Sequence, residues 1–278
     1  MRGHRMRVQV LVDDQAAAGL VSEHGLALWI ETGDREILFD TGAGTALEAN
    51  AAAMGVDLGQ AGIIVLSHGH YDHTGGLTAA LARASKADVY FRPGIDRVRY
   101  ALRGGTAREA GMPQTSREAW LRLSPARRHE VRDALSISPS VGLTGLIPRE
   151  TSYEDTGGPF YFDPEGLVSD PLDDDLALWI RRESGLVVIV GCAHAGLVNT
   201  LNRVQALNQG LKVEAVIGGF HLGSAGAERL AQTFAALRRL DVGRIVPLHC
   251  TGAAAVGFMK EALGGRVQPA TAGAVFEL

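Results

Sequence analysis

Four potential metal ligands lie within six residues of the sequence, at His68, His70, Asp72 and His73. Imidazole and carboxylate groups are the ligands that borderline divalent ions prefer. The run follows residues 63–66, a short apolar segment typical of a strand that is buried on both faces. We therefore expect a short loop after this strand to fold the four side chains around two adjacent cations. A surface loop that is rich in histidine is the alternative interpretation.

Glycine punctuates the same motif, at Gly69, Gly75 and Gly76. Glycine adopts backbone conformations that other residues avoid. These positions predict tight turns where the chain wraps the expected ions.

Three more histidines each follow a predicted strand further along the chain, at His194, His221 and His249. A single histidine in such a place is more often a hydrogen-bonded structural residue than a ligand. Together with the first cluster, however, the pattern predicts that His194 and His221 bind metal. We expect His249 to bind metal as well, with substrate steering or proton donation as alternative roles.

The surrounding sequence alternates predicted strands and helices. Hairpin signals near the start indicate antiparallel pairing, and the later alternation indicates sheets covered by helices. The pattern favours an α/β fold, a four-layer sandwich with helices outside two mixed sheets, over a doubly wound sheet. The predicted strands are residues 8–12, 26–31, 36–39, 63–66, 176–181, 186–190, 213–217 and 244–247, and the predicted helices are residues 45–54, 197–207, 227–240 and 253–263.

We interpret the chain as a single domain, residues 1–278, with an inserted, partly helical segment at about 92–165. Arginines accumulate in residues 92–132. They could contact phosphates, since a guanidinium binds phosphate through two hydrogen bonds, or they could lie on solvated helix faces. The insert could also form a lid or a dimer contact, so the sequence leaves the oligomeric state undecided.

Composition narrows the classes of function. The formal net charge is −4, so no global positive field exists to attract nucleic acid or an anionic membrane. No apolar run approaches the ~20 residues of a membrane helix. Only Cys192 and Cys250 occur, which favours a reducing, cytoplasmic setting. Both cysteines neighbour a candidate ligand and could supply thiolate to a soft metal, but we expect them to pack as small buried side chains. Residues 173–175, three consecutive aspartates, could reach the site, but we expect them to form a solvated loop.

The motifs carry a resemblance to a known family. The His-x-His-x-Asp-His run, preceded by Phe-Asp-Thr-Gly at residues 39–42, resembles the metallo-β-lactamase superfamily. Segments 23–26, 191–196, 219–222 and 249–252 are similar to the branch named for 7,8-dihydropterin-6-yl-methyl-4-(β-D-ribofuranosyl)aminobenzene 5'-phosphate synthase. The resemblance implies an αββα metallo-β-lactamase sandwich with its site at one edge.

The resemblance also implies roles for individual residues. His68 and His70 would hold one metal, and Asp72 and His73 the second. Asp40 would orient a ligand histidine, with a turn-capping aspartate as the alternative. The branch places Glu23 and His24 near the site, but the division of the later histidines between the metals stays open.

Three hypotheses for function follow. The first is a hydrolase in which a hydroxide at a dinuclear metal site attacks a small ester, lactone or phosphate-containing substrate, with Asp72 and His249 as catalytic residues. The second is the condensation of a pterin pyrophosphate with an aryl amine. The third is a metal-binding protein without turnover. The expected cofactors are two divalent ions, zinc by default with iron or manganese as alternatives, and the expected partner is a small molecule, anionic in the second hypothesis.

Overall fold

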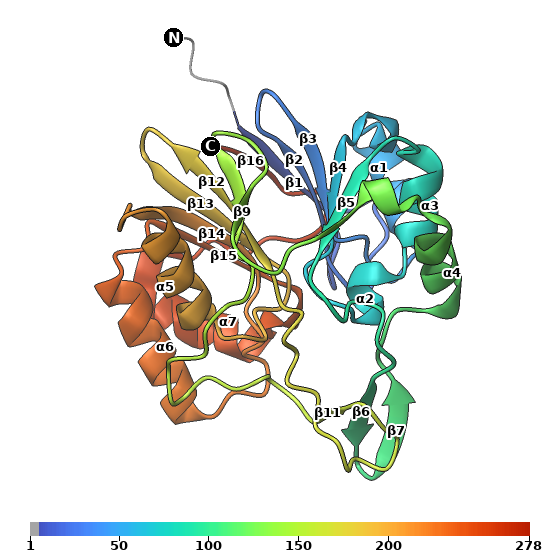
Figure 1. Cartoon of the computed structure of the whole chain (residues 1–278). Coiled ribbons are helices and arrows are strands. Elements are labelled where there is room, and N and C mark those ends of the chain that lie inside the picture. The colour runs from blue at the N-terminus through green and yellow to red at the C-terminus, as the bar shows by residue number, and fades with distance from the viewer. Residues whose placement is uncertain (1–5) are drawn as a thin grey trace. The chain divides into compact units, whose positions relative to one another are not determined.

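The computed structural model describes residues 6–278 and divides them into two compact units. Unit 1 comprises Met1–Val98, Ala110–Glu130 and Ala270–Leu278, of which residues 1–5 lie outside the described part. Unit 2 comprises Arg99–Glu109 and Val131–Pro269. Figure 1 labels the elements of both units.

Unit 1 is built on a mixed seven-stranded sheet. Its first strands pair antiparallel, and the later pairs β3·β4, β4·β5 and β5·β8 are parallel. In sheet order the strands are β16 (Val275–Glu277), β1 (Arg7–Val12), β2 (Ala27–Glu31), β3 (Glu36–Phe39), β4 (Ile63–Val65), β5 (Asp88–Phe91) and β8 (Arg128–Glu130).

Helices pack against one apolar face of this sheet. Trp29, Leu38 and Ile64 belong to the same buried cluster as Leu47 and Leu77 of the helices. This cluster fixes the strands whose ends carry the first histidine motif. The helices are α1 (Leu47–Ala53), α2 (Tyr71–Thr74), α3 (Leu77–Arg83) and α4 (Gln114–Arg122), with short 3₁₀ turns η1 (Leu58–Gln60) and η2 (Pro125–Arg127).

Unit 2 contains a six-stranded sheet and a small three-stranded one. The strands of the larger sheet are, in order, β15 (Arg244–Leu248), β14 (Val213–Gly219), β13 (Gly185–Val190), β12 (Ala177–Arg182), β10 (Val141–Leu143) and β9 (Leu135–Ser136). The small sheet has the order β11 (Phe160–Tyr161), β6 (Tyr100–Arg103) and β7 (Thr106–Glu109). Strands β13, β14 and β15 run parallel, so their carboxyl ends meet at one edge.

The parallel strands of unit 2 are buried on both faces, as their apolar sequences require. Every residue of β13 is buried, and Val188 shares a cluster with Leu201, Phe234 and Met259 of the helices. The helices are α5 (Leu197–Leu207), α6 (Ala227–Arg239) and α7 (Ala253–Leu263), with 3₁₀ turns η3 (His249–Thr251) and η4 (Gly264–Arg266).

The fold class predicted from the sequence is confirmed as a mixed α/β structure with several helix-covered sheets. Each predicted strand and helix is present, with ends that differ by at most a few residues. Segment 92–165 contains α4, the hairpin of β6 and β7, and strands of both larger sheets. Among residues 6–278, no helix has the length and apolar character needed to cross a membrane.

Candidate metal centre

The histidine motif of unit 1 begins just beyond β4, and all four candidate ligands are buried. His68 and His70 lie in the connection after the strand, whereas Asp72 and His73 lie in the single helical turn α2. The sequence predicted a loop for the whole motif, and this expectation is wrong for its second half. The helical turn directs adjacent side chains to different sides, which separates Asp72 from His73.

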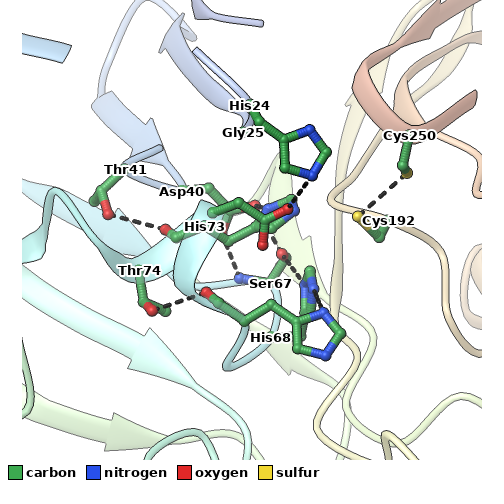
Figure 2. Close-up of polar contacts among 12 residues, drawn as sticks. His24, Gly25, Asp40, Thr41, Ser67, His68, His73, Thr74, Cys192 and Cys250 are labelled. Atoms are coloured by element: carbon green, nitrogen blue, oxygen red, sulfur yellow. Dashed lines mark hydrogen bonds and ion pairs between the residues drawn. The ribbon is translucent and has the colours of Figure 1, made fainter. Parts of the chain in front are cut away.

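Asp40 organises the motif from the end of β3. Its Oδ1 accepts from the Ser67 backbone N–H, and its Oδ2 accepts from both Ser67 Oγ and His73 Nδ1, each at 2.7 Å. Asp40 is fully buried and has a φ of 58°, a left-handed conformation that aspartate tolerates better than most residues. Figure 2 shows this carboxylate between Ser67 and His73.

These contacts fix the tautomers of two histidines. A carboxylate only accepts, so His73 donates from Nδ1 and Ser67 donates from Oγ to Asp40. Ser67 Oγ therefore accepts from His68 Nδ1, at 2.9 Å. Both rings then carry their lone pair on Nε2, the nitrogen with which they could bind a metal. The sequence did not predict this role for Ser67.

The geometry of His68 and His70 fits a shared ion. His68 Nε2 and His70 Nδ1 are 3.0 Å apart. Two nitrogens on one tetrahedral zinc would lie about 3.3 Å apart, given bonds of about 2.0–2.1 Å. A change of a few tenths of an ångström would thus suffice to replace the contact by two metal bonds.

Asp72 has a neighbour that the sequence left open. His24 Nε2 lies 3.3 Å from Asp72 Oδ2, and His24 Nδ1 lies 3.0 Å from Asp14 Oδ2. Gly25 packs against the motif, because a Cβ there would lie 2.4 Å from the Asp72 carbonyl oxygen. Glu23 instead accepts from backbone N–H groups at residues 43–46, including Ala43 at 2.7 Å, and so holds the loop before α1.

The glycines that close the motif act differently from the prediction. Gly75 has a φ of −64° and Gly76 a φ of −81°, which any residue could adopt. A Cβ at either position would lie 2.2 Å from a carbonyl oxygen, that of Ala43 or Thr41 respectively. These glycines therefore permit a close approach of two backbone segments rather than a tight turn.

The later histidines of unit 2 lie beyond the ends of its three parallel strands. His194 follows β13, His221 follows β14, and His249 begins η3 after β15. His221 and His249 have φ values of 46° and 47°, and Ala193 has a φ of 50°. Left-handed conformations are uncommon outside glycine and cluster at functional sites. The centroids of the His194 and His221 rings are 4.5 Å apart.

The His194 ring is held by the loop between β10 and β11, which contains Thr156. Its Nδ1 donates to the Thr156 carbonyl at 2.6 Å, which leaves Nε2 with the lone pair. Asp175 accepts from the Ala195 N–H at 2.7 Å. Asp174 and Asp175 are both buried, so the predicted solvated aspartate loop is wrong for these two residues.

The two cysteines follow two of these strands: Cys192 follows β13, and Cys250 follows β15. Cys192 Sγ and Cys250 Sγ are 3.2 Å apart, as the dashed line in Figure 2 marks. Burial acts to raise the pKa of the Cys250 thiol. The hydrogen bond with Cys192 and the nearby charges of His221 and His249 outweigh burial, and the pKa falls well below its usual value. The interpretation of the thiols as packing residues missed this contact.

The arginines of residues 92–132 do not share one role. Arg99 is fully buried, with Nε 3.1 Å from Asp170 and Nη1 3.0 Å from Asp174. Arg127 donates to the Ala87 carbonyl. The expectation of solvated helix faces is wrong for Arg99.

Comparison with known proteins identifies the family. The model of the metallo-beta-lactamase superfamily matches residues 23–249, which include every candidate ligand. The chain therefore belongs to the metallo-beta-lactamase superfamily.

Three known proteins are similar to this chain over most of its length. A Methanocaldococcus jannaschii protein named 7,8-dihydropterin-6-methyl-4-(beta-D-ribofuranosyl)-aminobenzene-5'-phosphate synthase is 31% identical over 92% of this chain and 91% of its own. Tm1679, described as a metal-dependent hydrolase of the beta-lactamase superfamily, has a TM-score of 0.82 at 30% identity and covers 98% of this chain and 99% of its own. YhfI from Bacillus subtilis shares the fold, with a TM-score of 0.58, 15% identity and coverage of 99% and 100%.

Proposed function

We propose that the chain is a metal-dependent hydrolase that acts on a small ester, lactone or phosphate-containing substrate. The observation that carries this proposal is the Asp40 network, which presets the tautomers of His68 and His73 beside His70 and Asp72. A purely structural histidine cluster would not need two rings with Nε2 prepared as an acceptor. Membership of the superfamily supports the same chemistry.

The donors fit divalent ions, and zinc is the default. In unit 1 we assign His68, His70, Asp72 and His73 as ligands. In unit 2, where His221 Nδ1 is buried without a hydrogen-bond partner among the described residues, we assign His194, His221 and His249. Bound divalent ions would lower the pKa of water toward about 7 and polarise a carbonyl or phosphoryl oxygen.

The chain's own residues would supply proton transfer and orientation. Asp72 is a carboxylate that can accept a proton, and His24, 3.3 Å away, can receive it or stabilise the charge. Because His24 is more than half exposed, that proton can pass to solvent. If His249 does not bind metal, its alternative role is to donate a proton to the leaving group or to orient the substrate.

A second candidate is the condensation of a pterin pyrophosphate with an aryl amine. The 31% identity to the M. jannaschii synthase favours it. Its leaving group would be pyrophosphate, which the same ions could bind.

One assay panel separates the two candidates. The purified protein is incubated with ester, lactone and phosphodiester substrates, and in parallel with a pterin pyrophosphate and an aryl amine. The hydrolase proposal expects turnover in the first set without any amine. Pyrophosphate release that requires the amine, with no turnover of the first set, would replace it by the second candidate.

A further inference from the structure

Two thiols from distant parts of the sequence meet at one edge of the larger sheet of unit 2. Cys192 follows β13 and Cys250 follows β15, and strand β14 lies between these two strands. Their sulfurs are nevertheless 3.2 Å apart. The side chains therefore converge over the end of the middle strand.

Gly219, the last residue of β14, makes this convergence sterically feasible. A Cβ there would lie 2.7 Å from Cys250 Sγ and 2.6 Å from the Gly191 carbonyl oxygen. Any larger residue would push the sulfur aside. Because Gly219 has no side chain, the end of β14 leaves room for the two thiols to meet.

His221 completes a group of three donors. A ring nitrogen of His221 and the two sulfurs all lie within 4.8 Å of one another. Its Nδ1 is buried and has no hydrogen-bond partner among residues 6–278. Gly157 packs directly on the ring, since a Cβ there would lie 2.1 Å from His221 Cδ2. The ring is thereby confined beside the thiols.

The spacing suits a metal better than a disulfide. Two sulfurs on one tetrahedral zinc would lie about 3.8 Å apart, given Zn–S bonds of about 2.3 Å. The thiols would separate by about 0.6 Å to reach this spacing. A disulfide, with an S–S bond of about 2.05 Å, would require them to approach by more than about 1 Å. Two thiolates and one imidazole favour zinc or cobalt over magnesium or manganese.

We propose that Cys192, Cys250 and His221 form a thiolate site for a thiophilic divalent cation, with the fourth coordination position left to another ligand. Both cysteines would bind as thiolates, and binding would release to solvent the thiol protons that they carry in the metal-free protein. The inference deepens the proposed function by assigning one of its ions to sulfur ligands within unit 2. The site itself does not depend on the histidines of unit 1.

Cobalt binding to the whole 278-residue chain tests this site, because cobalt thiolates have a charge-transfer band in the near ultraviolet. We expect the band to grow with added Co²⁺ and saturate at one equivalent for the site. The Cys192→Ser/Cys250→Ser variant should lose it. The His68→Ala/His70→Ala variant should keep the band while it loses hydrolysis, so failure of the thiolate site and failure of the proposed function are distinguishable.

Protection of the thiols provides a second measurement that needs no substitution. In the wild-type protein, zinc should slow the reaction of both cysteines with a thiol reagent by tenfold or more, whereas magnesium should not. A Gly157→Ala variant, which displaces the His221 ring, should weaken that protection. Absence of the cobalt band in wild-type protein, equal reactivity with and without zinc, or isolation of a Cys192–Cys250 disulfide that excludes metal would each overturn the proposal.

Discussion

The two units assemble their candidate ligands in opposite ways. Unit 1 takes four donors from residues 68–73 and fixes two of them through one buried carboxylate, Asp40. Unit 2 takes its donors from the ends of three parallel strands, with left-handed backbone at His221 and His249. A local motif depends on hydrogen bonds between neighbouring side chains. A dispersed set depends on the framework that aligns its strands.

The largest expected effect is on the local motif. His70→Ala should reduce hydrolysis to the background rate and lower the metal content, because it removes a ring nitrogen 3.0 Å from His68. The measurement is turnover together with elemental analysis. His129→Ala is the matched control in the same unit, since His129 pairs with Asp88 and stacks on Tyr90. Equal metal and activity in both variants would contradict the role of the motif.

The framework of unit 2 should be most sensitive at its buried ion pair. Asp174→Ala removes one of the carboxylates that pair with the buried Arg99 guanidinium and leaves its contact with Asp170. We expect the free energy of unfolding to fall by about 3–5 kcal/mol in denaturant titrations. Glu118→Ala, which breaks an exposed pair with Arg122, should cost less than about 1 kcal/mol. Similar losses in the two variants would refute the importance of the buried pair.

The carboxylate of unit 1 should tune metal affinity without affecting the fold. Asp40→Asn keeps the side-chain shape and tolerates the φ of 58°, but weakens the acceptor for His73 Nδ1. We expect metal affinity to fall about 10–100-fold, measured by competition with a chelator. Asp34→Asn, at an exposed turn, is the control and should leave affinity unchanged. An unchanged metal affinity of the Asp40→Asn variant would contradict this role and leave Asp40 as a residue that only caps a turn.

The smallest expected effect is on stability, at Asp175 in the loop before β12. Asp175→Asn retains one oxygen that can accept from Ala195 N–H, at 2.7 Å in the native protein, and removes the negative charge. We expect a loss of about 1 kcal/mol in the free energy of unfolding. A loss as large as that from Asp174→Ala would mean that unit 2 also relies on local carboxylates, and the contrast between the units would fail.

The same contrast explains what the sequence could predict. The motif of unit 1 is contiguous and follows an apolar strand, so its residues are visible without a structure. The resemblance to a family also implied that Asp40 orients a histidine, and Asp40 does bond His73. Ser67 was missed because a serine beside a histidine has no distinctive pattern.

The dispersed features were harder to predict because they depend on topology. The contact between Cys192 and Cys250 spans 58 positions and depends on strand β14 ending in Gly219. The pairing of β16 with β1 joins the two ends of the described chain and leaves no local signal. Burial of Asp174 likewise depends on Arg99, which is 75 residues away.

Elemental analysis of the purified protein, coupled to the hydrolysis assay before and after chelation, tests the central claim most directly. The proposed function predicts about two equivalents of divalent metal, loss of metal and turnover together on chelation, and recovery of both when zinc is restored. Full turnover in metal-free protein would contradict it.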